Sequence, residues 1–314
     1  MYNRNQVGPR AGVFSRERCY LGSSQKMYWP LSLAWNVSNG KEELYVVDTD
    51  NQVVHRVNSD GKASIFCGFL REETSKAKAE TPKERKFSSP SGIALSNKDG
   101  VLTLFVTEEA ENVVKKVTEN GKIELFVGKI DEKGFRDGED SLWNRPTGIA
   151  IDSKFEFLYL CDRDNHLIRR IDISTKSVKT ICGNIETGVL KDGIGSQAGF
   201  KTPEAIAVDY ESRFLFVIDT KTNIIRKVNL QTREVSTLCG GILPGFYDAR
   251  AHEAKFNMPM GIAIDRFGIL IVSDSQNHVI RRINQNGDVT TLIGIPERKG
   301  IEGKENLHIF FIHF

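Results

Sequence analysis

The sequence repeats itself five times, and this repetition limits the possible folds more than any other feature. A seven-residue pattern, which reads NHLIRRI at residues 165–171, recurs with its last apolar residue 54 to 60 positions from the next copy. A short apolar run ending in glycine follows each copy, and a proline that lies three residues after a bulky apolar residue precedes it. The five glycines are Gly68, Gly128, Gly183, Gly240 and Gly294. Three landmarks that keep their register over five copies indicate a repeat architecture.

Each repeat divides into four short apolar segments separated by turn residues. In the third copy they are GIAID, FLYLCD, HLIRRID and VKTICG, which are rich in strand-favouring residues. Pairs such as Asp60-Gly61 and Asn120-Gly121 predict tight hairpin turns, and no helical periodicity of useful length is present. The sequence therefore predicts an all-β fold, a β-propeller of four-stranded antiparallel blades.

The pattern resembles the NHL repeat, a propeller unit named for Asn-His-Leu. Asn165-His166-Leu167 matches the triplet and Asn277-His278-Val279 nearly does, and an upstream aspartate matches in four copies. These aspartates are Asp48, Asp162, Asp219 and Asp274. The second copy departs from the pattern with Glu108 and with Glu111-Asn112. The resemblance covers about residues 27–294, and it implies a ring that usually has six blades.

The repeats divide the chain into three parts. Residues 1–26 are an N-terminal segment that could supply an outer strand of the closing blade. Residues 27–294 form the propeller, and residues 295–314 form a linker and the start of an incomplete sixth blade. The repeats span about 27–68, 87–128, 143–183, 200–240 and 256–294. Two interpretations stay open: a gene product with a truncated sixth blade, which we favour, or five blades that close alone.

The recurring acid and base of each repeat are the obvious candidates for chemistry. Asp162 with Arg169, Asp219 with Arg226 and Asp274 with Arg281 are each placed to pair across neighbouring strands. Asp48 belongs to the same set. A catalytic group is needed once per protein, whereas this group recurs, so we predict a structural role for it and predict no catalytic residue.

The long linkers between blades are a better place to expect binding, because loops vary and carry function. In a propeller these linkers share a face with the loops between second and third strands, so that face is the predicted binding surface. Its candidate residues are Asp50, Arg163, His166, Lys221, Gln276 and His278. The aromatic residue at the end of a linker, Trp143, Phe200 or Phe256, is expected to fill the interface between blades.

Three functions are compatible with this fold, which hosts many activities. The favoured one is a non-catalytic scaffold that binds a protein partner. A propeller enzyme of the lyase or esterase type, with a metal in the central channel, is the second. Its ligands would be Asp152, Asp209 and Asp265 with Asn36 and Asn97, although a turn-forming role for these residues is favoured. RNA binding is the third, and it is weakly supported because the net charge is only +2.

Composition and local sequence limit the cellular location and the cofactors that can be expected. No apolar run approaches the roughly 18 residues of a membrane span, and the first 20 residues lack the apolar core of a signal peptide. The five cysteines include no CxxC pair, which argues against a disulfide framework or a zinc site. We therefore predict a cytoplasmic protein with no cofactor and no metal, and the sequence does not indicate its oligomeric state.

Overall fold

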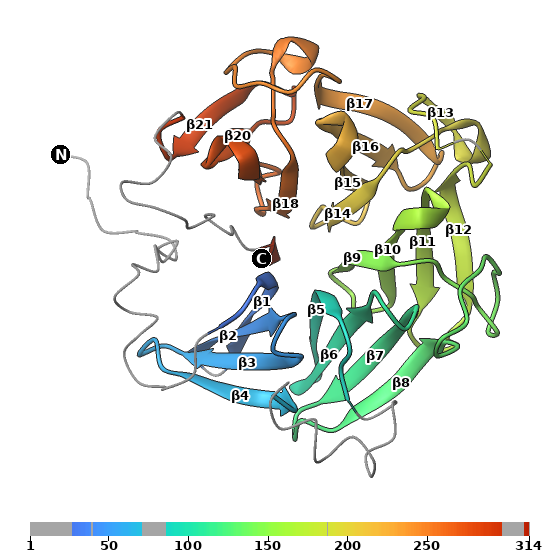
Figure 1. The fold of residues 1–314 in the computed structure, drawn as a ribbon, viewed down its shortest axis with the longest axis vertical. Helices are drawn as coiled ribbons and strands as arrows, with labels where there is room; N and C mark the ends of the chain where they lie inside the picture. The colour runs from blue at the N-terminus through green and yellow to red at the C-terminus, as the bar shows by residue number, and fades with distance from the viewer. Residues whose placement is uncertain (1–26, 39, 71–85, 187, 297–310, 314) are drawn as a thin grey trace.

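A computed structural model describes residues 27–38, 40–70, 86–186, 188–296 and 311–313. In this part of the chain five antiparallel sheets of at least four strands are arranged around one axis, which confirms the predicted all-β propeller (Figure 1). The predicted N-terminal segment 1–26 lies outside the described residues. None of the described helices is long and apolar enough to cross a membrane.

Each blade runs from the axis outward in the order of its strands. Blade 1 contains β1 (Pro30–Ser38), β2 (Lys41–Asp48), β3 (Val53–Asn58) and β4 (Ala63–Gly68). Blade 2 contains β5 (Pro90–Lys98), β6 (Val101–Glu108), β7 (Val113–Thr118) and β8 (Ile123–Gly128). Blade 3 contains β9 (Pro146–Ile151), β10 (Phe157–Asp162), β11 (Leu167–Asp172) and β12 (Val178–Gly183).

The last two blades follow the same plan. Blade 4 contains β14 (Pro203–Val208), β15 (Phe214–Asp219), β16 (Ile224–Asn229) and β17 (Glu234–Gly240), with the short β13 (Gly193–Ile194) on its outer edge. Blade 5 contains β18 (Pro259–Ile264), β19 (Leu270–Asp274), β20 (Val279–Ile283) and β21 (Val289–Ile293). Every inner strand begins at the proline of the sequence pattern, because proline lacks the N–H that a strand interior requires.

The apolar core lies between the blades. Four clusters of buried residues fill the interfaces between consecutive described blades. The aromatic residue at the end of the linker is buried in each of them: Phe87, Trp143, Phe200 and Phe256. The sequence assigned this role to the last three. Because both faces of most sheets are covered, their strands are apolar throughout and do not alternate.

A last short strand, β22 (Phe311–His313), joins the sheet of blade 1. It pairs in parallel with β1, with Ser32 opposite Phe311, and it lies beside β18 as well. The start of a sixth inner strand was expected here. The three residues lie between β18 and β1 near the axis, and their pairing with β1 adds them to the sheet of blade 1 (Figure 1).

The face of blade 5 that points away from blade 4 is more exposed than the equivalent face of the other four blades. In blades 1 to 4 the apolar residue before the last glycine is buried against the next blade: Cys67, Val127, Cys182 and Cys239. In blade 5 this position is Ile293, which is 45% exposed, and the neighbouring Leu292 is also exposed. The described part of the chain therefore leaves an apolar sheet face uncovered between blades 5 and 1.

Candidate functional site

The loops between the second and third strands turn at one end of the propeller. In blades 3, 4 and 5 the turn is a single 3-10 turn, at η2 (Arg163–Asn165), η4 (Thr220–Thr222) and η6 (Ser275–Asn277). In all five blades a backbone N–H of this loop donates to a carbonyl of the linker just before the inner strand. The donors are Asp50, Glu109, Asp164, Thr220 and Gln276, and the acceptors are Tyr28, Ser89, Asn144, Thr202 and Asn257. The linkers and loops thus share one surface, which we call the loop face.

A residue with left-handed backbone closes each of these turns. The five residues are Gln52, Asn112, His166, Asn223 and His278, with φ between 56° and 61°. Asparagine and histidine enter this region more readily than most residues. In blades 1 to 4 their side chains also reach the next blade: Asn112 Oδ1 accepts from the Arg145 N–H at 2.9 Å, and His166 Nδ1 lies 2.9 Å from the Lys201 carbonyl oxygen. His166 is therefore a half-buried bridge between blades 3 and 4.

The repeated aspartate and arginine form a buried pair in blades 3 and 5. Asp162 lies 2.9 Å from Arg169, and Asp274 lies 2.8 Å from Arg281, with both partners inaccessible to solvent. Asp162 also accepts from the Asn144 backbone N–H at 2.8 Å, so it fixes the end of the linker as well as the strand register. Burial raises the pKa of Asp162, while the Arg169 guanidinium lowers it.

Blade 4 corrects the expected pairing of Asp219 with Arg226. Both oxygens of Asp219 accept backbone N–H bonds, from Lys201 at 2.6 Å and from Thr202 at 2.9 Å. Arg226 instead donates to the Gly199 carbonyl at 2.9 Å and to a linker aspartate. Burial lowers the pKa of Arg226, while the nearby carboxylates of Asp192 and Asp219 act in the opposite direction.

Three linker aspartates extend the network of the buried arginines, because each accepts from the arginine of its blade and from a threonine of the outer strand. They are Asp137, Asp192 and Asp248, with Thr180, Thr237 and Thr291 as partners. Their nearly constant distance before the repeat motif is a sequence signal that could have identified them.

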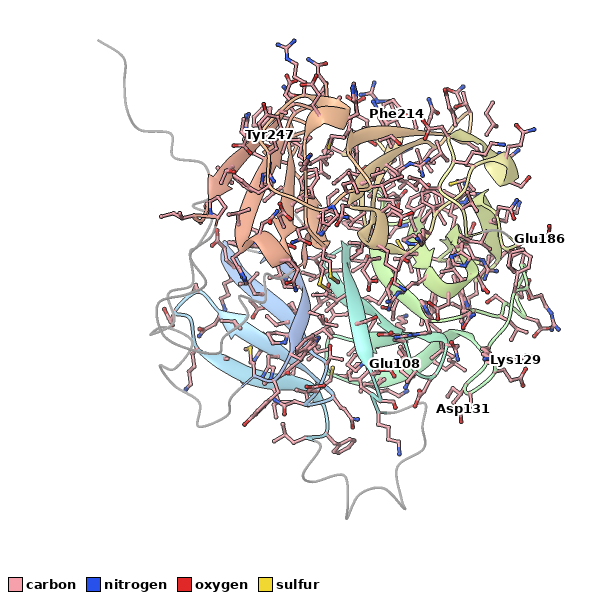
Figure 2. All side chains as sticks on the ribbon, turned by 45° about the horizontal axis from the view of Figure 1, so that its top comes forward. Glu108, Lys129, Asp131, Glu186, Phe214 and Tyr247 are labelled. Carbon is pink, nitrogen blue, oxygen red and sulfur yellow. The ribbon has the colours of Figure 1, made fainter. Side chains whose placement is uncertain are left out.

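Blades 1 and 2 vary the same arrangement. In blade 1, His55 replaces the arginine and lies 3.0 Å from Asp48. In blade 2, Glu108 and Glu111 surround a single base, Lys115, which lies 2.6 Å from Glu111. Glu108 is buried at the end of β6 (Figure 2), and burial raises its pKa to about 7 although Lys115 lowers it. Blade 2 therefore holds one carboxyl group more than its cation can balance.

The six candidate binding residues lie on the loop face but do not converge. Asp50, Lys221 and Gln276 are exposed at the tips of three different loops. His278 occupies the left-handed position of blade 5, as His166 does in blade 3. Arg163 is the candidate that contacts charged residues of other blades.

Arg163 belongs to an ion-pair cluster that spans blades 2, 3 and 4. Its Nη1 lies 3.3 Å from Glu109 Oε1, and its Nε lies 3.1 Å from Glu204 Oε2. Arg145 also contacts Glu109 and lies 3.8 Å from Asp164. We call these five residues the Glu–Arg cluster. Apart from Arg163, sequence reasoning missed them, although Glu204 is the one charged residue at its position of the inner strand, where the other repeats have Leu31, Ser91, Thr147 and Met260.

Three bulky residues of the loop face stand directly before the inner-strand proline with left-handed backbone. They are Trp29, Arg145 and Met258, with φ of 59°, 56° and 50°. The exposed fraction is 44% for Trp29 and 43% for Met258, and 49% for the side chain of Arg145. Left-handed backbone costs of order 1 kcal/mol or more for such residues. Surrounding hydrogen bonds hold this backbone conformation in place; for example, the Met258 N–H donates to Asn223 Oδ1 at 2.8 Å.

The acids at the far ends of the inner strands form turns. Asp152 Oδ1 accepts from the N–H groups of Glu156 and Phe157, and Asp209 and Asp265 make the same type of bonds. Asn97 donates to Asn36 at 3.0 Å. A cavity of about 80 Å³ at the axis is lined by inner-strand alanines and aliphatic residues with Trp35. No group of three metal-binding side chains is present among the residues that the structure describes.

Comparison with known proteins identifies the repeat. No family model matches the sequence. NHL repeat-containing protein 2 of Homo sapiens is 25% identical over 217 residues, which cover 66% of this chain and 30% of that protein. The chain spans less than a third of the length of the first curated relatives it matches.

Solved propellers share the fold at low identity. A protein of unknown function from Bacteroides thetaiotaomicron superimposes with a TM-score of 0.61 at 17% identity, over 92% of this chain and 64% of that one. A streptogramin B lyase does so with a TM-score of 0.54 at 13% identity, over 86% of this chain and 70% of that one. Similarity at this level shows the fold alone.

Proposed function

Because the chain is an NHL-repeat β-propeller, we propose that it is a non-catalytic scaffold that binds a protein partner through the loop face. The observation that carries the proposal is the set of exposed pre-proline residues Trp29, Arg145 and Met258. Tryptophan, arginine and methionine are enriched at protein interfaces relative to the rest of the surface. Tryptophan and arginine are also the residues that most often dominate binding energy.

The backbone of these residues supports the same conclusion. A left-handed residue directly before proline is doubly unfavourable, since proline itself biases its predecessor toward extended backbone. Observed strain of this kind often accompanies functional surfaces. Here it is found at three bulky residues of one face whose side chains stay about half exposed.

The two alternatives have less support. A channel enzyme would use the inner-strand acids, but Asp152, Asp209 and Asp265 are engaged by backbone N–H groups of their own turns. Stoichiometric calcium or zinc in the purified protein, lost when Asp152 and Asp265 are both replaced by alanine, would favour that alternative. RNA binding needs a basic face, whereas the Glu–Arg cluster contains three carboxylates and two guanidinium groups.

A cytoplasmic location is part of the proposal. It is supported by Cys67, Cys161, Cys182 and Cys239, which are free thiols in the described part of the chain. Free buried thiols are typical of reducing compartments.

Affinity capture from cell extract tests the function. The test variant carries Trp29→Ser, Arg145→Ser and Met258→Ser, and the matched control carries Tyr210→Ser and Phe267→Ser, exposed residues of the hairpins at the opposite end of the inner strands. We expect the protein captured by the wild type to be lost from the test variant by at least about tenfold, as for interface residues worth more than 1 kcal/mol each. The control should retain it. Equal capture by both variants, or capture abolished by ribonuclease, would refute the proposal.

A further inference from the structure

We propose that the loop face receives an arginine or lysine side chain of its protein partner at the carboxylate of Glu204. This inference rests on the proposed function and names the chemistry of the partner at one point of the face. It begins from the position of Glu204, the second residue of the inner strand β14 (Pro203–Val208). Its side chain is 13% exposed and faces Arg163 of the preceding blade.

The repeat does not require a carboxylate at this position. The equivalent residues Leu31, Ser91, Thr147 and Met260 are uncharged, and their blades fold in the same way. Moving a carboxylate from water into a mostly buried position costs free energy unless it is paired and hydrogen-bonded. A costly charged group that folding does not require is a candidate for binding.

Glu204 is also poorly satisfied compared with the buried aspartates of the repeat. Asp162 accepts hydrogen bonds from Asn144, Asn165 and Arg169. Among the described residues, Glu204 has a single partner, the Nε of Arg163 at 3.1 Å. One of its oxygens therefore keeps its acceptor capacity, and the partial exposure of the side chain leaves it accessible.

Its one partner is already shared. Arg163 also contacts Glu109 at 3.3 Å and lies 3.9 Å from Asp164. Arg145 contacts Glu109 and Asp164 in turn. The cluster thus has three carboxylates for two guanidinium groups, and one further cation would balance it. A planar guanidinium suits such a site well because it can donate to two carboxylate oxygens at once.

The protonation of Glu204 fits an unfilled cation site. Burial raises its pKa most, Arg163 and Arg145 lower it, and Glu109 and Asp164 raise it, which together bring the pKa to about 7. A cation placed beside the carboxylate would favour the charged form and lower this pKa. Binding of the partner side chain near neutral pH is therefore expected to release a proton from Glu204.

Carbon-13 NMR of the glutamate carboxyl groups tests the inference on the intact chain. The signal of Glu204 is assigned by its loss in Glu204→Gln, and Glu211→Gln, at a mostly exposed site of the opposite hairpin, is the control. The probes are the blocked tripeptides Gly-Arg-Gly, Gly-Lys-Gly and Gly-citrulline-Gly. We expect the two cationic peptides to lower the apparent pKa of Glu204 by about 0.5 or more, and the neutral citrulline peptide to leave it unchanged. An unchanged pKa with all three, or an equal shift with citrulline, would overturn the inference.

Capture of the natural partner separates this inference from the proposed function. If Glu204→Gln retains the captured protein while the Trp29, Arg145 and Met258 variant loses it, the cation site is wrong and the binding face stands. If no variant of the loop face affects capture, the proposed function is wrong. We expect Glu204→Gln to reduce capture at least about fivefold, as for a lost charge-assisted bond, with unchanged circular dichroism as evidence of folding.

Discussion

Replacement of Arg169 by methionine probes its pairing with Asp162, one of the three acid–arginine pairs that the sequence predicts. Methionine keeps much of the volume of the aliphatic stem and removes the charge. It leaves Asp162 buried without its counter-ion, since both side chains are inaccessible to solvent and lie 2.9 Å apart. It also removes the bonds that Arg169 donates to the Leu142 carbonyl and to Asp137.

The expected loss follows from these contacts. Removing one partner of a buried ion pair costs about 3–5 kcal/mol, because the remaining charge is uncompensated. For a domain of this size that corresponds to a decrease in Tm on the order of 10 °C. The adjacent Arg170→Met is the matched control, since Arg170 is half-buried, packs over Phe157 and interacts with the neutral Tyr159 side chain, not with a buried carboxylate. This replacement should cost about 1 kcal/mol or less.

The pH dependence of the destabilisation is an independent test of the same pair. Arg169 lowers the pKa of Asp162 in the folded protein, so its removal raises that pKa further above the value in the unfolded chain. When a carboxyl group has a higher pKa in the folded state than in the unfolded chain, it stabilises the folded state at low pH. This stabilisation is lost as the pH rises through the folded-state pKa. The deficit of Arg169→Met should therefore be larger at pH 7.5 than at pH 5.

Urea unfolding followed by tryptophan fluorescence measures both effects. The double variant Asp162→Asn with Arg169→Met should recover part of the loss, because it removes the uncompensated charge. A loss below about 1 kcal/mol in Arg169→Met, or a deficit that is independent of pH, would refute the assignment of this pair as the stabilising element of the blade.

Two further predictions use the same measurements. Glu108→Gln should flatten the dependence of stability on pH: the pKa of Glu108 is raised to about 7 in the fold, so its contribution is full below the unfolded value near 4.5 and is lost as the pH rises through 7. The prediction would be contradicted if the urea unfolding midpoint changed equally between pH 4.5 and 7.5 in the wild type and in Glu108→Gln. Val127→Ser should cost about 2 kcal/mol or more, whereas Ile293→Ser, at the exposed equivalent position, should cost about 1 kcal/mol or less. A large loss in Ile293→Ser would mean that this face of blade 5 is covered in solution.

The repeat predicted most of the architecture because each landmark has a local physical cause. The prolines mark where inner strands begin, and the buried Trp143, Phe200 and Phe256 lie at the interfaces that the sequence assigned to them. The loop face was predictable too, since it follows from the order of strands in any propeller. Its histidines also have a local reason: the repeat positions 52, 112, 166, 223 and 278, which hold Gln, Asn or His, all have left-handed backbone.

What the sequence determined by itself is the content of one blade, because strand pairing and turn type depend on neighbouring residues and repeat with them. What only the tertiary structure decided is which residues of different blades meet. Arg163 contacts Glu109, 54 residues away, and Glu204 of the following blade. No periodic pattern encodes such contacts, because the curvature of the ring brings unlike positions of successive repeats together at the loop face. Ile293 is exposed while Cys239, at the same position of the repeat, is buried, because blade 5 packs on Cys239 and no described blade packs on Ile293.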